Sequence, residues 1–107
     1  VDENDLMSKA LIVMTQKSFG CVGVINKKNN LVGIITDGDL RRNMNTSIVN
    51  KKAKMVMTAK PQFISSGTLV GEALNLMNKR KITSLFVCLN TKPFGIVHIH
   101  DLLRLSS

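Results

Sequence analysis

Hydrophobic and polar positions follow the same order twice along the chain. In each half, apolar residues three and four apart line one face of a predicted helix. These residues are Leu6, Ala10, Leu11 and Met14, then Leu69, Ala73, Leu74 and Met77. Two β-prone runs follow each helix, at 21–25 and 31–35 and at 84–89 and 94–97, with turn residues at 26–30 and 90–93. With further helices beginning near Asp37 and Ile99, each half is predicted to be helix, strand, turn, strand, helix, in an α/β (α+β) fold.

The two halves also match residue by residue. At one constant offset, Leu6, Ala10, Leu11, Met14 and Lys17 correspond to Leu69, Ala73, Leu74, Met77 and Arg80. After the loss of one residue in the turn, Gly33, Ile34, Asp39, Leu40 and Arg42 correspond to Gly95, Ile96, Asp101, Leu102 and Arg104. A colinear series with a single gap in a turn indicates a tandem repeat.

We expect a first motif at 1–45, a linker with the lead-in to the second motif at 46–60, and a second motif at 61–107. The segment 46–60 is polar and basic and has no long hydrophobic period. Units of about 45 residues are too small to bury both faces of their helices alone. The two motifs are therefore expected to pack sheet against sheet about a pseudo-twofold axis.

Composition and charge exclude two classes of partner. Hydrophobic residues make up 44% of the 107 residues, but no stretch approaches the roughly 20 apolar residues that cross a bilayer, so no membrane partner is expected. The net charge of +8 suggests nucleic acid, yet there is no Trp or Tyr and the basic residues are scattered. The charge is interpreted as a solvated surface with a site for an anionic small molecule.

The cysteines and the first residues bear on the compartment. Cys21 and Cys88 lie in apolar runs without metal-ligand or redox spacing, which favours buried thiols in a reducing environment. The acidic start from Val1 lacks the features of a secretory signal, so a cytoplasmic location is expected. Because the chain does not begin with Met, we expect it to be a segment of a longer protein.

The segment from Gly33 to Leu40 carries the candidate chemistry, since a buried strand runs directly into a helix start. The hydroxyl of Thr36 and the helix N-terminus suit a phosphate, and the carboxylate of Asp39 suits both hydroxyls of a ribose. Gly38 would let the backbone approach such a ligand. Thr36-x-x-Asp39 is also close to a capping box, in which the two side chains merely close the helix end. One helix start can serve both purposes.

Other constellations are weaker. His98 and His100 precede Asp101, but adjacent first-turn positions rarely converge on a metal without further ligands, so no metal site is expected. No Ser or Cys stands in a recognisable set with a base and its orienting partner, so no catalytic residues are predicted in this chain.

Paired units that contain Gly-Ile-Ile-Thr-x-x-Asp-Leu resemble CBS motifs, and the residues from Val56 to Pro61 resemble the Met-Thr-x-x-Pro start of such motifs. The run from Ile35 to Arg42 is similar to the first repeat of KpsF/GutQ-type arabinose-5-phosphate isomerases. Three runs are similar to their second repeat, at 72–77, 81–87 and 98–104. The resemblance covers essentially the whole chain, although the first unit begins at Val1, the equivalent of Ile64, without its own Met-Thr-x-x-Pro segment.

The resemblance implies a regulatory CBS pair attached to a sugar-isomerase domain that serves synthesis of the Kdo sugar of lipopolysaccharide or capsule. The family's ribose and phosphate positions fall on Asp39 and Thr36 and, by repeat equivalence, on Asp101 and His98. Since His98 replaces a hydroxyl with an imidazole, the two sites are expected to be unequal. Contacts with a base are implied for Val22, Gly23, Val24, Leu85, Phe86 and Val87.

The resemblance also bears on ligand and assembly. Adenine nucleotides (AMP or ATP) are what CBS pairs generally imply, whereas the pathway suggests CMP-Kdo as a feedback signal. A homodimer of CBS pairs is expected. The alternative is a purely structural dimerisation module that binds no ligand and uses Thr36 and Asp39 only to cap a helix.

Overall fold

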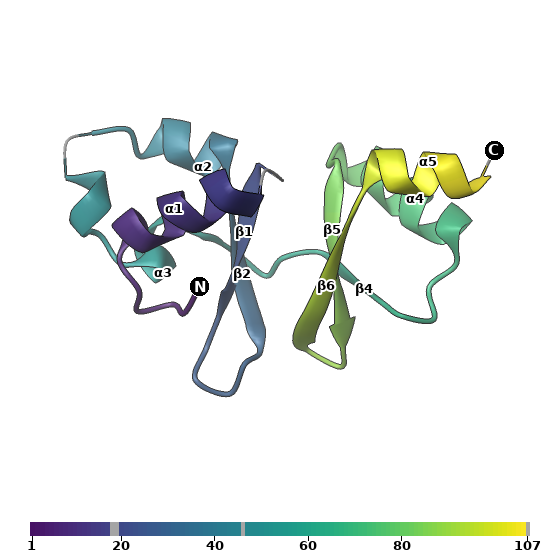
Figure 1. The fold of residues 1–107 in the computed structure, drawn as a ribbon, viewed down its shortest axis with the longest axis horizontal. Helices are drawn as coiled ribbons and strands as arrows, with labels where there is room; N and C mark the ends of the chain where they lie inside the picture. Colours follow the sequence, from purple (N-terminus) through teal and green to yellow (C-terminus); the bar gives the residue numbers. More distant parts are fainter. Residues whose placement is uncertain (18–19, 46, 107) are drawn as a thin grey trace. The chain divides into compact units, whose positions relative to one another are not determined.

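The computed structural model describes residues 1–17, 20–45 and 47–106, which fall into two compact units, Val1–Pro61 (unit 1) and Gln62–Ser107 (unit 2) (Figure 1). Unit 1 contains α1 (Met7–Lys17), β1 (Cys21–Ile25), β2 (Leu31–Thr36), α2 (Asp37–Arg42), the 3₁₀ helix η1 (Ile48–Asn50), α3 (Ala53–Val56) and β3 (Thr58–Ala59). Unit 2 contains β4 (Phe63–Ser65), α4 (Val70–Arg80), β5 (Ser84–Leu89), β6 (Lys92–His98) and α5 (Ile99–Ser106). The predicted order of helix, strand, strand and helix is confirmed in both units.

Each unit has one three-stranded sheet. In unit 1 the order is β1-β2-β3 and both pairings are antiparallel. In unit 2 the order is β4-β5-β6, with β4 parallel to β5 and β5 antiparallel to β6. The mixed α/β class is therefore confirmed, while packing of the two sheets about a pseudo-twofold axis stays a prediction.

The repeat found in the sequence is repeated in the strand register. Cys21 lies opposite Thr36 in unit 1, as Ser84 lies opposite His98 in unit 2. An irregularity in register follows Val24 in one hairpin and Val87 in the other. A parallel bridge joins Asp2 to Ile25 just as β4 joins Ser65 to Cys88. The same backbone frame thus recurs at the same offset as the sequence matches.

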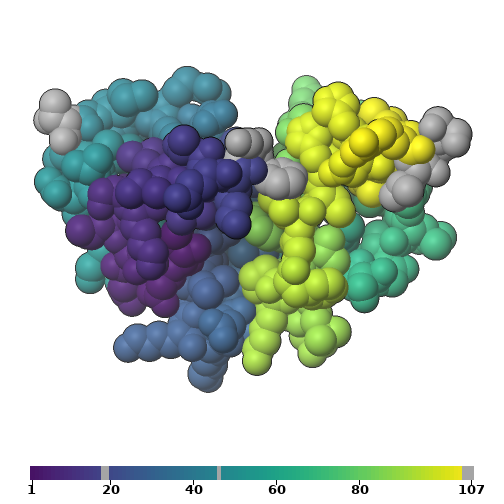
Figure 2. Space-filling model, viewed as in Figure 1, coloured from purple at the N-terminus to yellow at the C-terminus, as the bar shows by residue number. Residues whose placement is uncertain are grey.

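The hairpin turns differ in length, as the gap in the alignment requires. In unit 1 the turn at 26–30 projects from the rest of the unit (Figures 1 and 2). In unit 2, Leu89 pairs with Lys92, so only two residues connect the strands, and Asn90 takes a positive φ of 58°. The turn predicted at 90–93 is too long, because Lys92 and Pro93 already belong to β6.

Each unit has its own hydrophobic core between its helices and its sheet. In unit 1 the core includes Met7, Ala10 and Met14 of α1 with Val22, Val24 and Ile35 of the strands. In unit 2 it comprises Ala73, Met77, Leu85 and Leu102. The helices α1 and α4 therefore each bury residues three or four apart, as their period predicts.

The prediction that Leu6 and Leu69 begin the two buried helix stripes is wrong. Leu6 is 46% exposed and Leu69 is 68% exposed, because both residues precede their helices. Before the first helical residue the backbone is extended, so a side chain there does not follow the helical period. Met7, which is fully buried, begins the stripe in α1.

Most of the segment predicted as a linker, from residue 47 to residue 60, folds with unit 1. Ile48, Ala53 and Val56 from η1 and α3 are buried in the core of this unit. The backbone N–H of Ala53 donates to the carbonyl of Asp5 at 2.7 Å, which ties the segment to the start of the chain. Elements of three and four residues are too short to produce a hydrophobic period, so the pattern of the sequence does not reveal them.

Met57 lies directly against Gly33 of β2. A Cβ on Gly33 would stand 2.2 Å from Met57 Sδ and 2.8 Å from Met57 Cγ. At the equivalent Gly95 the nearest atom would be Val87 Cβ at 3.9 Å. The two glycines therefore have different packing requirements although the repeat aligns them.

We predict that Gly33→Ala lowers the free energy of unfolding by about 1–3 kcal/mol, because Met57 must leave its place against the sheet. Gly95→Ala is the matched control and should change stability by no more than about 0.5 kcal/mol. Urea denaturation of both variants, of Met57→Ala and of the double variant Gly33→Ala with Met57→Ala gives the coupling between positions 33 and 57. Equal losses in the two single variants would contradict the close approach of Met57.

Candidate functional site

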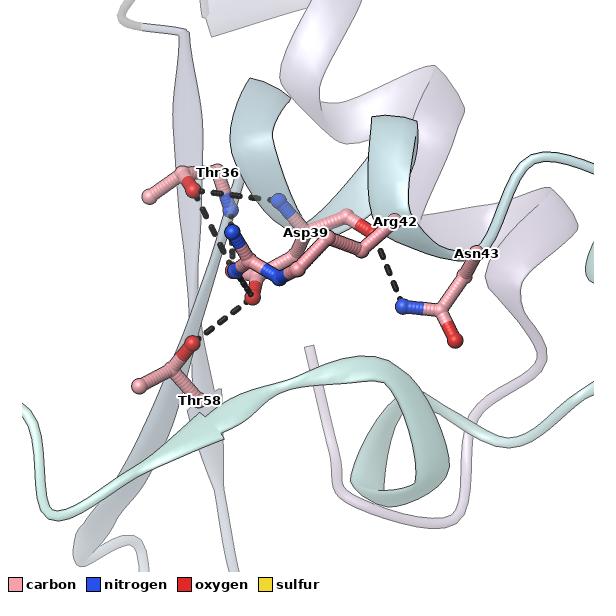
Figure 3. Close-up of polar contacts among 5 residues, drawn as sticks. All are labelled: Thr36, Asp39, Arg42, Asn43 and Thr58. Atoms are coloured by element: carbon pink, nitrogen blue, oxygen red, sulfur yellow. Dashed lines mark hydrogen bonds and ion pairs between the residues drawn. The ribbon is translucent and has the colours of Figure 1, made fainter.

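The candidate site of unit 1 forms where β2 passes directly into α2 (Figure 3). Thr36 is the N-cap and has an extended backbone, with φ −118° and ψ 173°. Its Oγ1 accepts from the backbone N–H of Asp39 at 3.4 Å, and Asp39 Oδ2 accepts from the backbone N–H of Thr36 at 2.9 Å. The capping box that the sequence offered as an alternative is therefore present.

The carboxylate of Asp39 is buried, and both of its oxygens accept hydrogen bonds. The residue is 3% exposed. Its Oδ2 accepts from Thr36 twice, from the N–H at 2.9 Å and from Oγ1 at 3.2 Å. Its Oδ1 accepts from Thr58 Oγ1 at 2.7 Å and from Arg42 Nη2 at 2.5 Å. A carboxylate offers about four acceptor positions, so these four donors use all of them.

This environment sets the ionisation of Asp39. Burial by itself raises the pKa of the carboxyl, but hydrogen bonds from Thr58, from the backbone of Thr36 and from Arg42 outweigh it and lower the pKa below its ordinary value. The group is therefore ionised at neutral pH. A buried anion surrounded by exchangeable donors is suited to accept hydroxyl groups from a ligand.

Gly38 makes room for Arg42. A Cβ on Gly38 would lie 3.3 Å from Arg42 Nη1 and 3.5 Å from Thr36 Oγ1. The missing side chain thus allows the guanidinium to fold back over the start of α2 toward Asp39. The predicted role, approach of the backbone to a ligand, would require Arg42 to move first.

Sequence reasoning missed three residues of this cluster, Arg42, Asn43 and Thr58. Arg42 was matched to Arg104 by the repeat, and that match was the available signal. Thr58 belongs to the Met-Thr-x-x-Pro segment, but it lies 19 residues after Asp39, so only the tertiary structure brings the two together. Asn43 also joins the cluster, since its side-chain amide donates to the backbone carbonyl of Asp39 at 2.8 Å and closes the end of α2.

Unit 2 repeats this arrangement with different side chains. Asp101 Oδ2 accepts from the backbone N–H of His98 at 3.2 Å, and Oδ1 accepts from Arg104 Nη2 at 2.5 Å. These two bonds lower the pKa of Asp101. The side chain of Asp101 is 46% exposed, against 4% for that of Asp39. The second carboxylate is therefore much more open to solvent.

His98 occupies the position of Thr36 and also acts as a cap. Its Nδ1 accepts from the backbone N–H of His100 at 3.2 Å, and the two imidazoles stack with ring centroids 4.8 Å apart. Opposite His98, Ser84 Oγ is buried without a hydrogen-bond partner among the described residues. Buried hydroxyls usually find partners, so Ser84 is a further candidate for polar contact at this site.

The strand residues predicted to contact a base divide into two groups. Val22, Val24 and Leu85 are buried within the cores of their units, because alternate strand positions point toward the helices. Contact of these three residues with a base stays a prediction. Gly23, Phe86 and Val87 are half-buried and remain candidates.

Three further observations concern the part of the chain that the structure describes. No group of three or more His, Cys, Asp or Glu side chains there could hold a metal ion. No helix in these ranges is long and apolar enough to cross a membrane. Cys21 and Cys88 are free and buried, and burial raises the pKa of both thiols.

Curated relatives match this chain over part of their own length. An uncharacterized protein of Rickettsia prowazekii (strain Madrid E) is 45% identical over 105 residues, which cover 98% of this chain and 33% of that protein. Arabinose 5-phosphate isomerase KdsD of Yersinia pestis is 40% identical over 97 residues, which cover 89% of this chain and 30% of that protein. The chain thus spans about a third of the length of these relatives.

Solved structures share the fold. CBSX2 in complex with AMP has a TM-score of 0.82 at 23% identity, covering 99% of this chain and 84% of that chain. The CBS domain pair of protein MJ0100, in complex with 5′-methylthioadenosine and S-adenosyl-L-methionine, has a TM-score of 0.83 at 22% identity, covering 98% and 84%. The family model of the CBS domain matches residues 1–46 and 53–107, which is nearly the whole sequence. The chain therefore belongs to the CBS domain family.

Proposed function

We propose that this chain is a regulatory module that binds a ribose-containing nucleotide or nucleoside at Asp39. The observation that carries the proposal is the ionised, buried carboxylate of Asp39, whose acceptor positions are all held by donors of the chain itself. A ligand with two adjacent hydroxyls can replace two of these donors without leaving the anion unsatisfied.

The ligands of the similar structures support this choice of chemical group. AMP, 5′-methylthioadenosine and S-adenosyl-L-methionine all contain adenine linked to a ribose ring, but only AMP carries a phosphate. What they share besides the base is the cis-diol of the ribose, which can donate two hydrogen bonds to a carboxylate. These complexes favour adenosine compounds over CMP-Kdo as the first ligands to test.

Arg42 connects the ribose to a phosphate in this proposal. Its side chain is 66% exposed and reaches Asp39 with one terminal nitrogen. When a diol takes over part of the carboxylate, the guanidinium becomes available for an anionic group on the same ligand. AMP would then bind more tightly than adenosine.

The protein context of this module is proposed from the relatives. Because KdsD of Yersinia pestis matches over most of this chain, we infer that the chain is the regulatory part of an arabinose 5-phosphate isomerase that supplies Kdo synthesis. Catalysis would belong to another domain, and the CBS pair would pass ligand occupancy to it, as a dimer in the cytoplasm. The free, buried cysteines are consistent with a reducing compartment.

A structural module without a ligand is the second candidate. The complete capping box favours it, because Thr36 and Asp39 already satisfy each other and the start of α2. In this view the cluster only holds β2, α2 and β3 together. The two candidates differ in whether the carboxylate ever exchanges its partners.

We predict that AMP binds this chain and raises its melting temperature, and that Asp39→Asn weakens AMP binding at this site at least tenfold by removing a charged acceptor. Asp37→Asn is the matched control, since it removes a neighbouring carboxylate outside the hydrogen-bond cluster. Titration calorimetry with AMP and 2′-deoxy-AMP measures the effect. Absence of both heat and thermal shift at millimolar AMP would leave the structural module as the function.

The pH dependence of stability reports on the cluster independently of any ligand. The pKa of Asp39 is lowered in the folded protein, while an unfolded Asp titrates near pH 4. Its contribution is therefore present above about pH 5 and is lost as the pH falls through about 4 toward the folded value. We predict that between about pH 6 and pH 3 the native chain loses more of its free energy of unfolding than Asp39→Asn does. Parallel stability curves from urea denaturation would contradict this.

A further inference from the structure

We propose that the hydroxyl of Thr58 competes with the ligand diol for Asp39, so that binding at the first site releases β3. This inference rests on the proposed function and names how occupancy of the same site is transmitted. In this proposal Thr58 is a positioning residue. Its hydroxyl is bonded to the carboxylate of Asp39 until the ligand diol replaces that hydroxyl.

Thr58 differs from the other donors to Asp39 by its origin. Thr36 and Arg42 lie at the start and end of α2, so their bonds are local. Thr58 comes from β3 and donates to Asp39 Oδ1 at 2.7 Å, across 19 residues of sequence (Figure 3). This bond is therefore a direct tie between α2 and β3.

The donors to Asp39 differ in how easily a ligand diol can displace them. A diol brings two donors, but the four acceptor positions of Asp39 are filled. Both groups of Thr36 belong to the helix cap, where its hydroxyl also accepts from the N–H of Asp39. Thr58 and Arg42 share Oδ1 and are not needed for the cap. These two are the donors that a diol can displace at least cost.

Apart from the bond between Thr58 and Asp39, few contacts hold β3 to the rest of unit 1. The strand has two residues, Thr58 and Ala59, both exposed. It pairs with Ile34 and Gly33 of β2, and Met57 before it packs against Gly33. Three residues after β3 the chain enters unit 2 at Gln62. Release of Thr58 would therefore loosen the segment that leads from one unit to the next.

The test compares Thr58→Val, which keeps the shape but removes the donor, with Thr58→Ser, which keeps the donor. With the competitor removed, Thr58→Val should bind adenosine about five- to tenfold more tightly than the native chain, and Thr58→Ser should bind like it. Affinity for 2′,3′-dideoxyadenosine should not differ among the three proteins, because this ligand brings no diol. A merely structural Thr58 would alter binding of both ligands alike.

A second measurement uses the native chain and does not depend on the folding of a variant. Saturating adenosine should speed amide hydrogen exchange at 57–59 at least severalfold, while exchange in β1 does not increase. Equal or weaker adenosine binding by Thr58→Val, or unchanged exchange at 57–59, would overturn the inference and leave the proposed function standing. If no adenosine or AMP binds to the native chain, the proposed function fails and the inference with it.

Discussion

A carboxylate that leaves water must find donors for its oxygens, and Asp39 takes them from the end of β2, from the last turn of α2 and from β3. Removing any partner would leave part of a buried anion unsatisfied, at a cost of about 1–3 kcal/mol. The junction of strand and helix, the fold of Arg42 over Gly38 and the position of β3 are therefore linked through one side chain. A ligand with hydroxyl donors can replace some of these partners of Asp39 and still leave every carboxylate acceptor position with a hydrogen bond.

The two repeats keep the same backbone frame and use it differently. Both place an Asp three residues after the last residue of a strand and an Arg three residues further on. In unit 1 the carboxylate is buried and Thr58 closes it, whereas in unit 2 Asp101 is half exposed beside stacked imidazoles. The register recurs in both units, whereas the surroundings of the two carboxylates differ.

The fold follows closely from the sequence because periodicity and repetition report on backbone structure. Strands at 21–25 and 84–89 and helices beginning at Asp37 and Ile99 lie where β-prone runs and turn residues predict them. The errors fall at element ends and in short elements. Leu6 and Leu69 precede their helices, and η1 and α3 are too short for any period, so their burial depends on contacts with distant residues.

By itself the sequence determined the tandem repeat, the α/β class and the pairing of Thr36 with Asp39, since all three rest on local spacing. Only the tertiary structure decided that Val22, Val24 and Leu85 belong to the cores, that Met57 needs the space above Gly33, and that Thr58 holds Asp39. The physical reason is that local spacing does not specify which face of a strand the helices cover, or which residues far apart in the chain meet. The contacts of Met57 and Thr58 depend on how β3 is folded against β2, which no local pattern specifies.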